Sequence, residues 1–384
     1  MTDTLLNLIQ AIHDSPTRAV LVVAGAGSQA LADLLAVGGA SRTLIEALVP
    51  YGQAAFDDFL GQQPDQYVAG HTARLLAGRA HTRGCWLEPV ATHVVGIACT
   101  AAISSDRPRR GEHCAYLATW QASRLVELHL QLEKGLRGRT GEERLISNVL
   151  INAVAAASGL PQQELVTLGA GDQLCVQIHD YAALVTRLQC GELDCFGLAD
   201  HGLPYAPAEH PAVLLSGSFN PLHEGHLGMA RAAAELLGQP VAFELAAINV
   251  DKPPLLPEVI LDRIAQFAGR HPVFVSAAPT YQQKARLYPG VTFVVGYDTA
   301  VRILEPRYYG NSVAQMEAAL AEIAQQGCHF LVAGRLVNDG HFRDLADIAL
   351  PARFAQLFRT LPAELFRYDI SSSQLRASGA RGSR

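Results

Sequence analysis

From residue 211 onward, short apolar runs alternate with stretches of helical character. The runs read AVLLS, VAFELAAI, HPVFVS, VTFVVG and CHFLVAG, and stretches such as GHLGMARAAAELLG and PEVILDRIAQFAGR separate them. Apolar runs of this length are typical of strands that are buried on both faces. Strands that alternate with helices predict a doubly wound parallel sheet, because each helix returns the chain to the start of the next strand. We therefore expect an α/β domain over residues 211–384.

The first part of the chain shows a second set of patterns. RAVLVVAGAG (18–27), ATHVVGIAC (91–99) and HCAYLATWQ (113–121) predict strands, SQALADLLAVG predicts a helix, and a long amphipathic helix is expected around 140–158. These elements predict an α/β domain over residues 1–160. Between residues 161 and 210 the apolar pieces are short and broken by Gly, Asp, Pro and His, which is typical of a connecting subdomain that ends in a linker.

Composition restricts the class of protein. The 384 residues are enough for two domains, and 49% hydrophobic with 17% charged residues indicates compact domains and excludes a disordered chain. A formal net charge of -6 leaves no basic surface for a phosphodiester backbone, so we expect no nucleic-acid partner. Neither a signal-peptide pattern nor a run of about 18 apolar residues is present. We expect a cytoplasmic protein without membrane contact, whose seven cysteines are reduced.

One stretch of the second domain carries candidate chemistry. In VLLSGSFNPLHEGHLGMARAA (213–233) a predicted strand ends in a turn whose glycine, Gly217, lets the backbone approach a ligand closely. His223 and His226 lie three positions apart at the expected start of a helix, on one side of it. Free amide groups and the helix dipole favour an anion there. The pattern predicts a phosphate site; the alternative is one histidine that caps the turn and one on the surface.

A second polar stretch lies further along the chain. YDISSSQLRASG (368–379) places three serines before a predicted helix that carries Arg376. Serine hydroxyls satisfy the free amides of a helix start or donate to phosphate oxygens, and an arginine one turn later binds phosphate with its planar guanidinium. Taken alone, the pattern favours a helix cap followed by a solvated arginine.

Together, GSFNPLHEGH and ISSSQLR resemble two signature segments of the nucleotidylyltransferase superfamily, a strand-linked His-x-Gly-His and a C-terminal Ile-Ser-Ser-x-x-x-Arg. The first is most similar to that of the nicotinamide or nicotinate mononucleotide adenylyltransferases. INVDKPPL (248–255) and FVVGYD (293–298) are similar to two further segments of that family. The resemblance covers roughly residues 211–376 and implies a Rossmann-like nucleotide-binding fold.

The resemblance implies a role for each matched residue. The catalytic residues would be His223, His226, Lys252 and Arg376. The nucleotide-binding residues would be Ser216, Gly217, Ser218, Phe219, Asn220, Gly225, Gly296, Asp298, Ile370, Ser371, Ser372 and Ser373. The implied reaction transfers AMP from ATP, bound with Mg²⁺, to a phosphate-bearing small molecule and releases pyrophosphate. Nicotinamide or nicotinate mononucleotide is the first choice of acceptor, and no protein-held metal site is expected.

Other interpretations stay open. Lys252 is otherwise a solvated loop lysine, and Asp298 a cap of the helix that follows it. Another adenylyl or cytidylyl transfer is the alternative reaction, because His-x-Gly-His contacts phosphates and says little about the acceptor. A non-catalytic nucleotide-binding regulator is a third interpretation, favoured by the short segment after Arg376.

Residues 18–158 resemble the C-terminal domain of the competence-damage-inducible protein A family, which contains nicotinamide mononucleotide deamidases. The carriers are LLAVGGASRTLIEALVPYGQAAFDDFLG (34–61), VVGIACTAA (94–102) and GLRGRTGEERLISNVLINAV (135–154). In this alignment the family's Glu-Ser-Cys-Thr-Gly-Gly stretch falls on VAGAGS, residues 23–28.

The deamidase chemistry is eroded in this alignment. Ala24 and Ala26 stand at the hydroxyl positions, and an alanine cannot be a nucleophile. Tyr51 is kept, but Phe56 occupies the position of a lysine. Ser28 is a substitute only if the register shifts by one or two residues. We therefore expect a binding, regulatory or dimerising domain, and a homo-oligomer formed through it.

Overall fold

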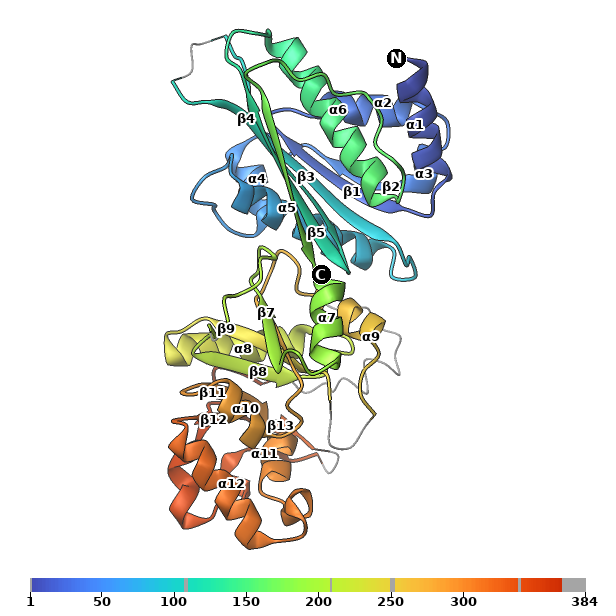
Figure 1. Ribbon diagram of the computed structural model, residues 1–384. Helices are drawn as coiled ribbons and strands as arrows, with labels where there is room; N and C mark the ends of the chain where they lie inside the picture. Colours follow the sequence, from blue (N-terminus) through green and yellow to red (C-terminus); the bar gives the residue numbers. More distant parts are fainter. Residues whose placement is uncertain (1, 107–109, 208, 249–252, 338–339, 368–384) are drawn as a thin grey trace.

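The computed structural model describes residues 2–106, 110–207, 209–248, 253–337 and 340–367. Each half of the chain builds its own sheet with helices on both sides, and the two units lie end to end in Figure 1. No helix within these ranges is long and apolar enough to span a bilayer. The fold is α/β in both units, as the sequence predicts.

The N-terminal sheet has six strands in the order β2-β1-β3-β4-β5-β6. They are β1 (Arg18–Ala24), β2 (Leu44–Leu48), β3 (Val94–Ala102), β4 (His113–Gln121), β5 (Arg124–Leu132) and β6 (Gln173–Asp180). β1 pairs in parallel with β2 and β3, whereas β3, β4, β5 and β6 are antiparallel neighbours. This sheet is mixed because Ala122 and Ser123 alone connect β4 to β5, a hairpin too short for a parallel crossover.

Helices cover both faces of this sheet. They are α1 (Asp3–Asp14), α2 (Ser28–Ala36), α3 (Ala40–Thr43), α4 (Gln53–Leu60), α5 (Gly70–Leu87) and α6 (Arg139–Ala157). Buried side chains of α1, α2 and α6 form one core with the sheet, and those of α4 and α5 belong to the core on its other face. Six of the seven residues of β1 are buried, and Arg18 is partly exposed. This is expected for a strand that is covered on both faces.

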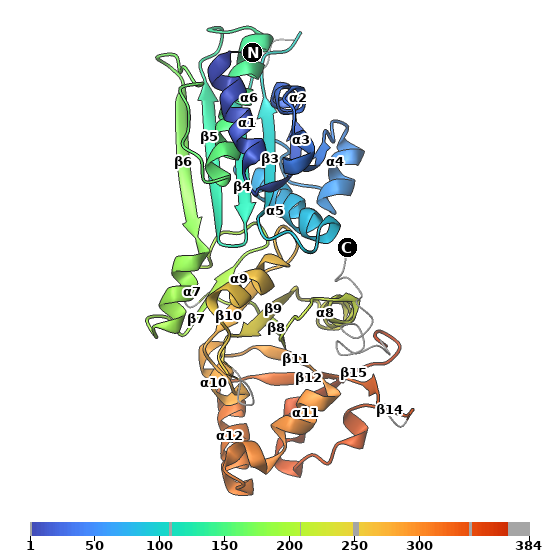
Figure 2. The same cartoon turned by 90° about the vertical axis from the view of Figure 1, so that its right-hand side faces the viewer.

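The expected connecting subdomain is divided between the two sheets. β6 pairs with β5 over eight residues, so residues 173–180 complete the N-terminal sheet. The chain then passes through α7 (Tyr181–Gln189) to β7 (Cys195–Leu198), which pairs antiparallel with the edge of the second sheet. Figure 2 shows β6 running along the upper unit and leading directly into α7 beside the lower one. β6 and β7 are edge strands of the two sheets, so this segment is divided between the sheets rather than forming a separate subdomain.

The C-terminal sheet has seven strands in the order β15-β12-β11-β8-β9-β10-β7. Besides β7 they are β8 (Val213–Gly217), β9 (Val241–Ala246), β10 (Val273–Ser276), β11 (Thr292–Gly296), β12 (His329–Ala333) and β15 (Phe358–Leu361). All of these six pair in parallel. From β8 the chain adds β9 and β10 on one side, then returns to add β11, β12 and β15 on the other. The predicted doubly wound sheet is confirmed.

Helices of the second unit pack on separate cores. They are α8 (Glu224–Leu237), α9 (Pro257–Ala265), α10 (Tyr281–Leu287), α11 (Tyr297–Ile303) and α12 (Val313–Gln325), followed by a small hairpin of β13 (Arg335–Leu336) and β14 (Phe342–Arg343). Side chains of α8 and α9 share a continuous core with α4 and α5 of the N-terminal unit, whereas α10 and α12 cover the opposite face. The two units are therefore joined by buried apolar contacts as well as by the chain.

Two glycines allow this close packing of the units. A Cβ atom at Gly78, within α5, would lie 2.7 Å from the Cα of Gly269. Gly269 has a φ of +69°, which favours glycine, and its amide donates to the carbonyl of Asp200 at 3.0 Å. The backbones of the two units therefore touch where a side chain on either glycine would push them apart.

We expect Gly78→Ala to lower the free energy of unfolding by about 1–3 kcal/mol, because the added methyl group meets backbone that cannot rotate away. Helix propensity alone favours alanine by about 1 kcal/mol, so a loss isolates the steric effect. The measurement is urea unfolding of the full chain. Gly38→Ala is the control, since nothing lies within 4 Å of its added Cβ. Equal midpoints for both variants would contradict the prediction.

Candidate functional site

A cavity of about 290 Å³ opens at the carboxyl ends of β8, β11 and β12, beside the start of α8. Its lining includes Ser216, Gly217, His223, Gly225, His226, Met229, Gly296, Asp298, Arg335 and Phe366. β8 and β11 are neighbours in the sheet. The chain adds β9 and β10 on one side of β8 and then returns to add β11 on its other side. Open α/β sheets bind ligands at this switch point, where the strand ends leave a crevice. Seven of the residues predicted from sequence thus line one cavity, together with Arg335 and Phe366.

The two histidines form a stacked pair at the start of α8. Their ring centroids are 3.8 Å apart, and His223 is the N-cap residue of the helix. The Nδ1 of His223 accepts a hydrogen bond from the amide of Gly225 at 3.1 Å, and the Nδ1 of His226 accepts one from the amide of His223 at 3.3 Å. A neutral ring whose Nδ1 is an acceptor carries its proton on Nε2. The backbone therefore selects the Nε2–H tautomer of both rings.

Burial keeps His226 neutral. Removal from solvent, reinforced by the neighbouring His223 ring, lowers the pKa of His226 to about 3. Near neutral pH this side chain is therefore a hydrogen-bond donor without charge. An uncharged donor at a helix start suits an anionic oxygen, to which it adds a directed N–H group while the helix supplies partial positive charge. The alternative of one surface histidine is wrong, because both rings lie in the cavity wall.

Phe219 lies beneath the cavity and supports it. Its side chain is fully buried, and its ring meets those of Phe243, Phe267 and His226 edge to face, the last with centroids 5.2 Å apart. A Cβ on Gly217 would come within 2.7 Å of the Phe219 ring, so glycine is required for this packing. Phe219 is not part of the described lining of the cavity, so its part in nucleotide binding stays a prediction. The turn buries the ring because it follows an apolar strand over an aromatic core.

Two residues of the sequence-predicted site, in addition to Phe219, lie outside the described lining of the cavity. Ser218 and Asn220 are exposed, and neither belongs to the described lining of the cavity. The carbonyl of Ser218 accepts a hydrogen bond from Arg263 at 3.0 Å, which fixes the backbone of this turn. Their part in nucleotide binding stays a prediction.

Gln266 holds the turn in place and was not found from the sequence. Its Nε2 donates to the carbonyl of Phe219 at 3.0 Å, and its Oε1 accepts from the amide of Leu222 at 2.8 Å. One amide side chain thus satisfies both ends of the loop between β8 and α8. No local pattern marks this role, because the bonded groups are more than forty positions apart in the chain.

Asp298 is paired with an arginine that sequence reasoning missed. Its carboxylate forms an ion pair with Arg335, and both residues line the cavity. Asp298 is not the cap of α11, whose N-cap is Gly296. Arg335 directly follows the apolar run of β12, and this position after a strand of a parallel sheet is the signal that was available. The pair places a cation and an anion in the cavity wall.

Several predicted residues lie outside the described ranges. These are Lys252, Ile370, Ser371, Ser372, Ser373 and Arg376. Their contribution to the cavity stays a prediction. Within the described ranges, no group of three or more histidine, cysteine or acidic side chains is arranged to hold a metal ion.

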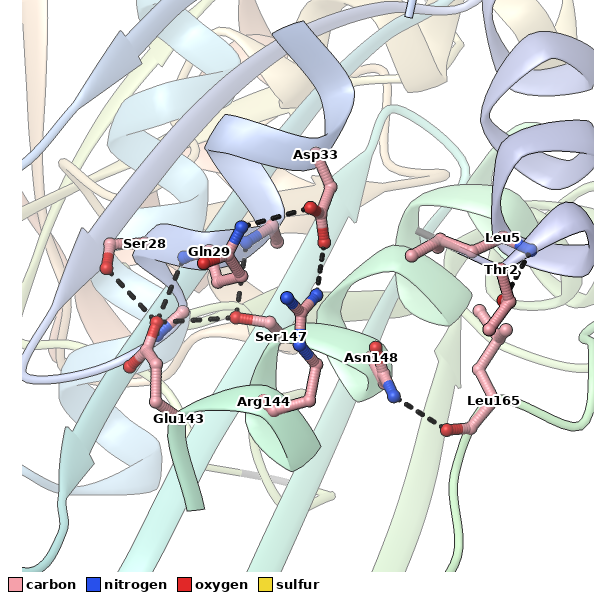
Figure 3. A network of polar contacts seen from close by, with 12 residues as sticks. Thr2, Leu5, Ser28, Gln29, Asp33, Glu143, Arg144, Ser147, Asn148 and Leu165 are labelled. Carbon is pink, nitrogen blue, oxygen red and sulfur yellow. Dashed lines mark hydrogen bonds and ion pairs between the residues drawn. The ribbon is translucent and has the colours of Figure 1, made fainter. Parts of the chain in front are cut away.

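The N-terminal unit has its own helix start, and a side chain of the protein occupies it. The carboxylate of Glu143 accepts hydrogen bonds from the amides of Gly27 and Gln29, at 3.1 and 3.0 Å, and from the hydroxyl of Ser28 at 3.1 Å. Ser147 adds a bond from its hydroxyl to the same carboxylate at 3.4 Å (Figure 3). Glu143 and Ser147 come from α6, more than a hundred positions later. The anion site at the start of α2 is therefore already filled.

Four residues that align with or lie next to the deamidase positions can be located in the structure, namely Ala26, Tyr51, Phe56 and Ser28. Ala26 is buried in the core, and Phe56 is 3% exposed in the core of α4 and α5. Tyr51 is 72% exposed, so it does not face Phe56 within a shared site. Ser28, the one hydroxyl near the lost positions, is engaged with Glu143. Ser28 thus takes part in closing the start of α2, whereas Phe56 packs in the core on the other face of the sheet.

We expect Glu143→Gln to lower the free energy of unfolding by about 1–2 kcal/mol, because the uncharged amide loses charge-assisted bonds and the interaction with the start of α2. Urea unfolding of the full chain measures this loss. Glu112→Gln is the control, since its exposed carboxylate meets Gln131 alone among described hydrogen bonds. Equal stability of both variants would show that the network contributes little.

The C-terminal unit matches a known family. Residues 214–378 match the family described as cytidylyltransferase-like. A Schizosaccharomyces pombe protein named "Putative nicotinamide mononucleotide adenylyltransferase" is 28% identical over 123 residues, which cover 28% of this chain and 48% of that protein. The chain thus spans about half the length of this curated relative. Residues 214–378 are thus similar to this family, and the predicted resemblance to nucleotidyltransferases is confirmed.

Solved structures give a second set of likenesses. The competence/damage inducible protein CihA of Agrobacterium tumefaciens is 20% identical, with a TM-score of 0.34 over 41% of this chain and 97% of that chain. A competence-damaged protein (CinA) superfamily protein of Klebsiella pneumoniae is 14% identical, with a TM-score of 0.29 over 41% of this chain and 97% of that chain. The names are those of the family that residues 18–158 resemble.

Proposed function

We propose that the C-terminal domain transfers a nucleotidyl group from a nucleoside triphosphate to the phosphate of a small molecule. ATP is the proposed donor, and nicotinamide or nicotinate mononucleotide the proposed acceptor. The observation that carries the proposal is the histidine pair, whose Nε2–H tautomers are set by the backbone at a helix start in the switch-point cavity. The match of residues 214–378 to the cytidylyltransferase-like family supports it.

In the proposed reaction an oxygen of the acceptor phosphate attacks the α-phosphorus of the triphosphate. A new phosphorus–oxygen bond forms, the bond from the α-phosphorus to the bridging oxygen breaks, and pyrophosphate leaves with the bond electrons. No covalent enzyme intermediate is needed. Catalysis then consists of positioning and of stabilising negative charge on the phosphoryl oxygens. His223 and His226 would donate from Nε2 to these oxygens, and the dipole at the start of α8 would add partial positive charge.

The remaining groups would act around this pair. Arg335, which lines the cavity beside Asp298, would meet the negative charge of one substrate. Lys252, Arg376 and the serines 371–373 are proposed triphosphate contacts on the strength of the resemblance. Mg²⁺ enters this scheme as part of the MgATP substrate, whose charge it partly neutralises.

The acceptor is the least constrained part of the proposal. The relative from Schizosaccharomyces pombe supports nicotinamide mononucleotide by its name, whereas the description of the family favours CTP as an alternative donor. A reaction that uses ATP or CTP and free mononucleotides suits the cytoplasm.

The N-terminal unit is proposed to bind a ligand or to regulate the C-terminal domain, and not to deamidate nicotinamide mononucleotide. Pairing of two chains through it stays a prediction, for which the exposed Val176 and Ile178 of edge strand β6 are candidates.

The experiment is a pyrophosphate-release assay on the full chain. ATP and CTP are each combined with nicotinamide mononucleotide, nicotinate mononucleotide and other phosphate-bearing acceptors in the presence of Mg²⁺. Turnover with ATP and one of the two named mononucleotides is expected. Turnover with CTP alone would shift the assignment to cytidylyl transfer. Nucleotide binding without turnover on any acceptor would contradict the proposal and support a regulator. Ammonia release from nicotinamide mononucleotide is measured in parallel and is expected to be absent.

A further inference from the structure

A second cavity lies between the two units, away from the switch point. It measures about 300 Å³ and is lined by Asp58, Phe59, Arg79, Arg83, Trp86 and Arg270. Arg79 comes from α5 of the N-terminal unit, whereas Arg270 follows α9 in the C-terminal unit. The two arginines stand next to the crossing of Gly78 and Gly269, so the contact of the two backbones brings them together.

Two of the three arginines form no ion pair with any acidic residue that the structure describes. Arg83 forms an ion pair with Glu46 through two hydrogen bonds. Within the described parts of the chain, neither Arg79 nor Arg270 forms an ion pair with a carboxylate. The Nε of Arg79 donates to the carbonyl of Phe59 at 3.2 Å. The Nε of Arg270 is buried and makes no hydrogen bond to any described residue. Asp58, the acidic residue of the lining, is exposed.

Two half-buried cations that form no ion pair are unfavourable, although the charge of Glu224 offsets part of this at Arg270. Burial lowers the pKa of Arg79, and burial with the nearby charge of Arg79 lowers the pKa of Arg270 to about 10. Both remain charged near neutral pH, so desolvation and mutual repulsion oppose this arrangement in the free chain. Gly61 makes room for it, because a Cβ there would come within 2.5 Å of a terminal nitrogen of Arg79. The fold thus exposes guanidinium groups to a cavity rather than pairing them internally.

From this geometry we infer that the cavity binds a phosphate-bearing small molecule, whose anionic group bridges Arg79 and Arg270. The planar fork of a guanidinium matches the oxygens of a phosphate, and two forks from opposite walls match its several oxygens. Phe59 and Trp86 supply flat apolar surface beside the arginines. The ligand therefore joins the two units by contacting both.

An adjoining cavity gives the ligand room for more than the phosphate. It measures about 620 Å³ and shares Trp86 and Arg270 with the arginine-lined cavity. Together the two cavities have space for a ligand of mononucleotide size. Leu222 and Gln266 also line the larger cavity, and they hold the loop that ends at His223. A ligand that fills the larger cavity would therefore contact residues of the turn that positions the histidine pair.

The side chains of the larger cavity are suited to binding a ligand and not to chemical reaction with it. Cys85 and His81 face each other there, with Sγ and Nδ1 3.7 Å apart. Burial raises the pKa of the Cys85 thiol to about 12 and lowers the pKa of His81 to about 4. The thiol is therefore protonated and the imidazole neutral at physiological pH, so this pair is not an activated nucleophile.

The test is binding of inorganic phosphate and of AMP to the full chain, measured by isothermal titration calorimetry. Arg79→Gln and Arg270→Gln are each expected to weaken phosphate binding about tenfold or more, because each removes a charge-assisted contact. Arg286→Gln is the matched control, since this exposed arginine is paired with Glu322 far from the cavity. His226→Ala separates the two sites, because it changes the switch-point cavity alone.

Unchanged phosphate binding in both arginine variants would overturn the inference, as would the absence of saturable binding to the unmodified chain. Loss of phosphate binding in His226→Ala, with the arginine variants unaffected, would also overturn it and place the anion at the switch point. Misfolding is tested by thermal unfolding without ligand, where Arg270→Gln is expected to be at least as stable as the unmodified chain because it removes an unpaired buried charge. The readout is binding, so absence of nucleotidyl transfer leaves it unaffected.

Discussion

Replacing His226 by alanine is expected to reduce kcat for pyrophosphate release by about 100- to 1,000-fold, the usual effect of removing one preorganised donor to a developing anion. The Nδ1 of His226 is bonded to the amide of His223, so its Nε2–H is oriented before substrate arrives. Burial keeps the ring neutral, with a pKa of about 3, so the lost interaction is a directed hydrogen bond rather than a mobile charge. Steady-state pyrophosphate release with ATP and the best acceptor measures the effect.

His329→Ala is the matched control for this prediction. His329 is an exposed residue at the first position of β12, on the same sheet but at the end opposite the cavity. Its replacement is expected to leave kcat within about twofold, since surface substitutions away from such features have small effects. The assignment fails if both variants retain full kcat. A rise in KM alone in His226→Ala would mean that the ring binds substrate and transition state equally.

Replacing Lys284 by methionine is expected to lower the free energy of unfolding by about 3–5 kcal/mol, because it leaves a buried carboxylate without its counter-ion. The Nζ of Lys284, on α10, lies 2.6 Å from an oxygen of Glu244, on β9, and the two side chains are 6% and 0% exposed. The other carboxylate oxygen accepts from Ser276 at 2.6 Å. Urea unfolding of the full chain, followed by circular dichroism, measures the loss.

Arg286→Met, two positions further along α10, separates burial from the mere loss of an ion pair. Arg286 is 56% exposed in its pair with Glu322, so its removal is expected to leave the unfolding midpoint nearly unchanged. Adding Glu244→Gln to Lys284→Met removes the stranded charge while keeping an acceptor for Ser276, and most of the loss should be recovered. Equal losses for Lys284→Met and Arg286→Met would disprove the role given to burial.

Short-range patterns were sufficient for the fold of the C-terminal domain. Strands alternating with helices predicted its parallel sheet, because apolar runs can be recognised within a few residues and parallel strands require crossovers. The histidine pair was likewise visible, since residues three apart at a helix start share one side by local geometry. His223 and His226 indeed lie in one cavity wall.

Contacts between distant residues were decided by the tertiary structure. The burial of Phe219 depends on Phe243 and Phe267, the pairing of Asp298 depends on Arg335, and the clamp on the turn comes from Gln266. Each requires the order of strands in the sheet, which no local pattern specifies.

The N-terminal unit shows the same division. The sequence by itself determined that Ala24 and Ala26 present no nucleophile, because an alanine side chain has no reactive group. Only the tertiary structure decided that Glu143 fills the neighbouring helix start and that Arg79 meets Arg270 between the units. Composition and local periodicity are properties of neighbouring residues, whereas a carboxylate or a cation finds its place only when packing brings remote segments into contact.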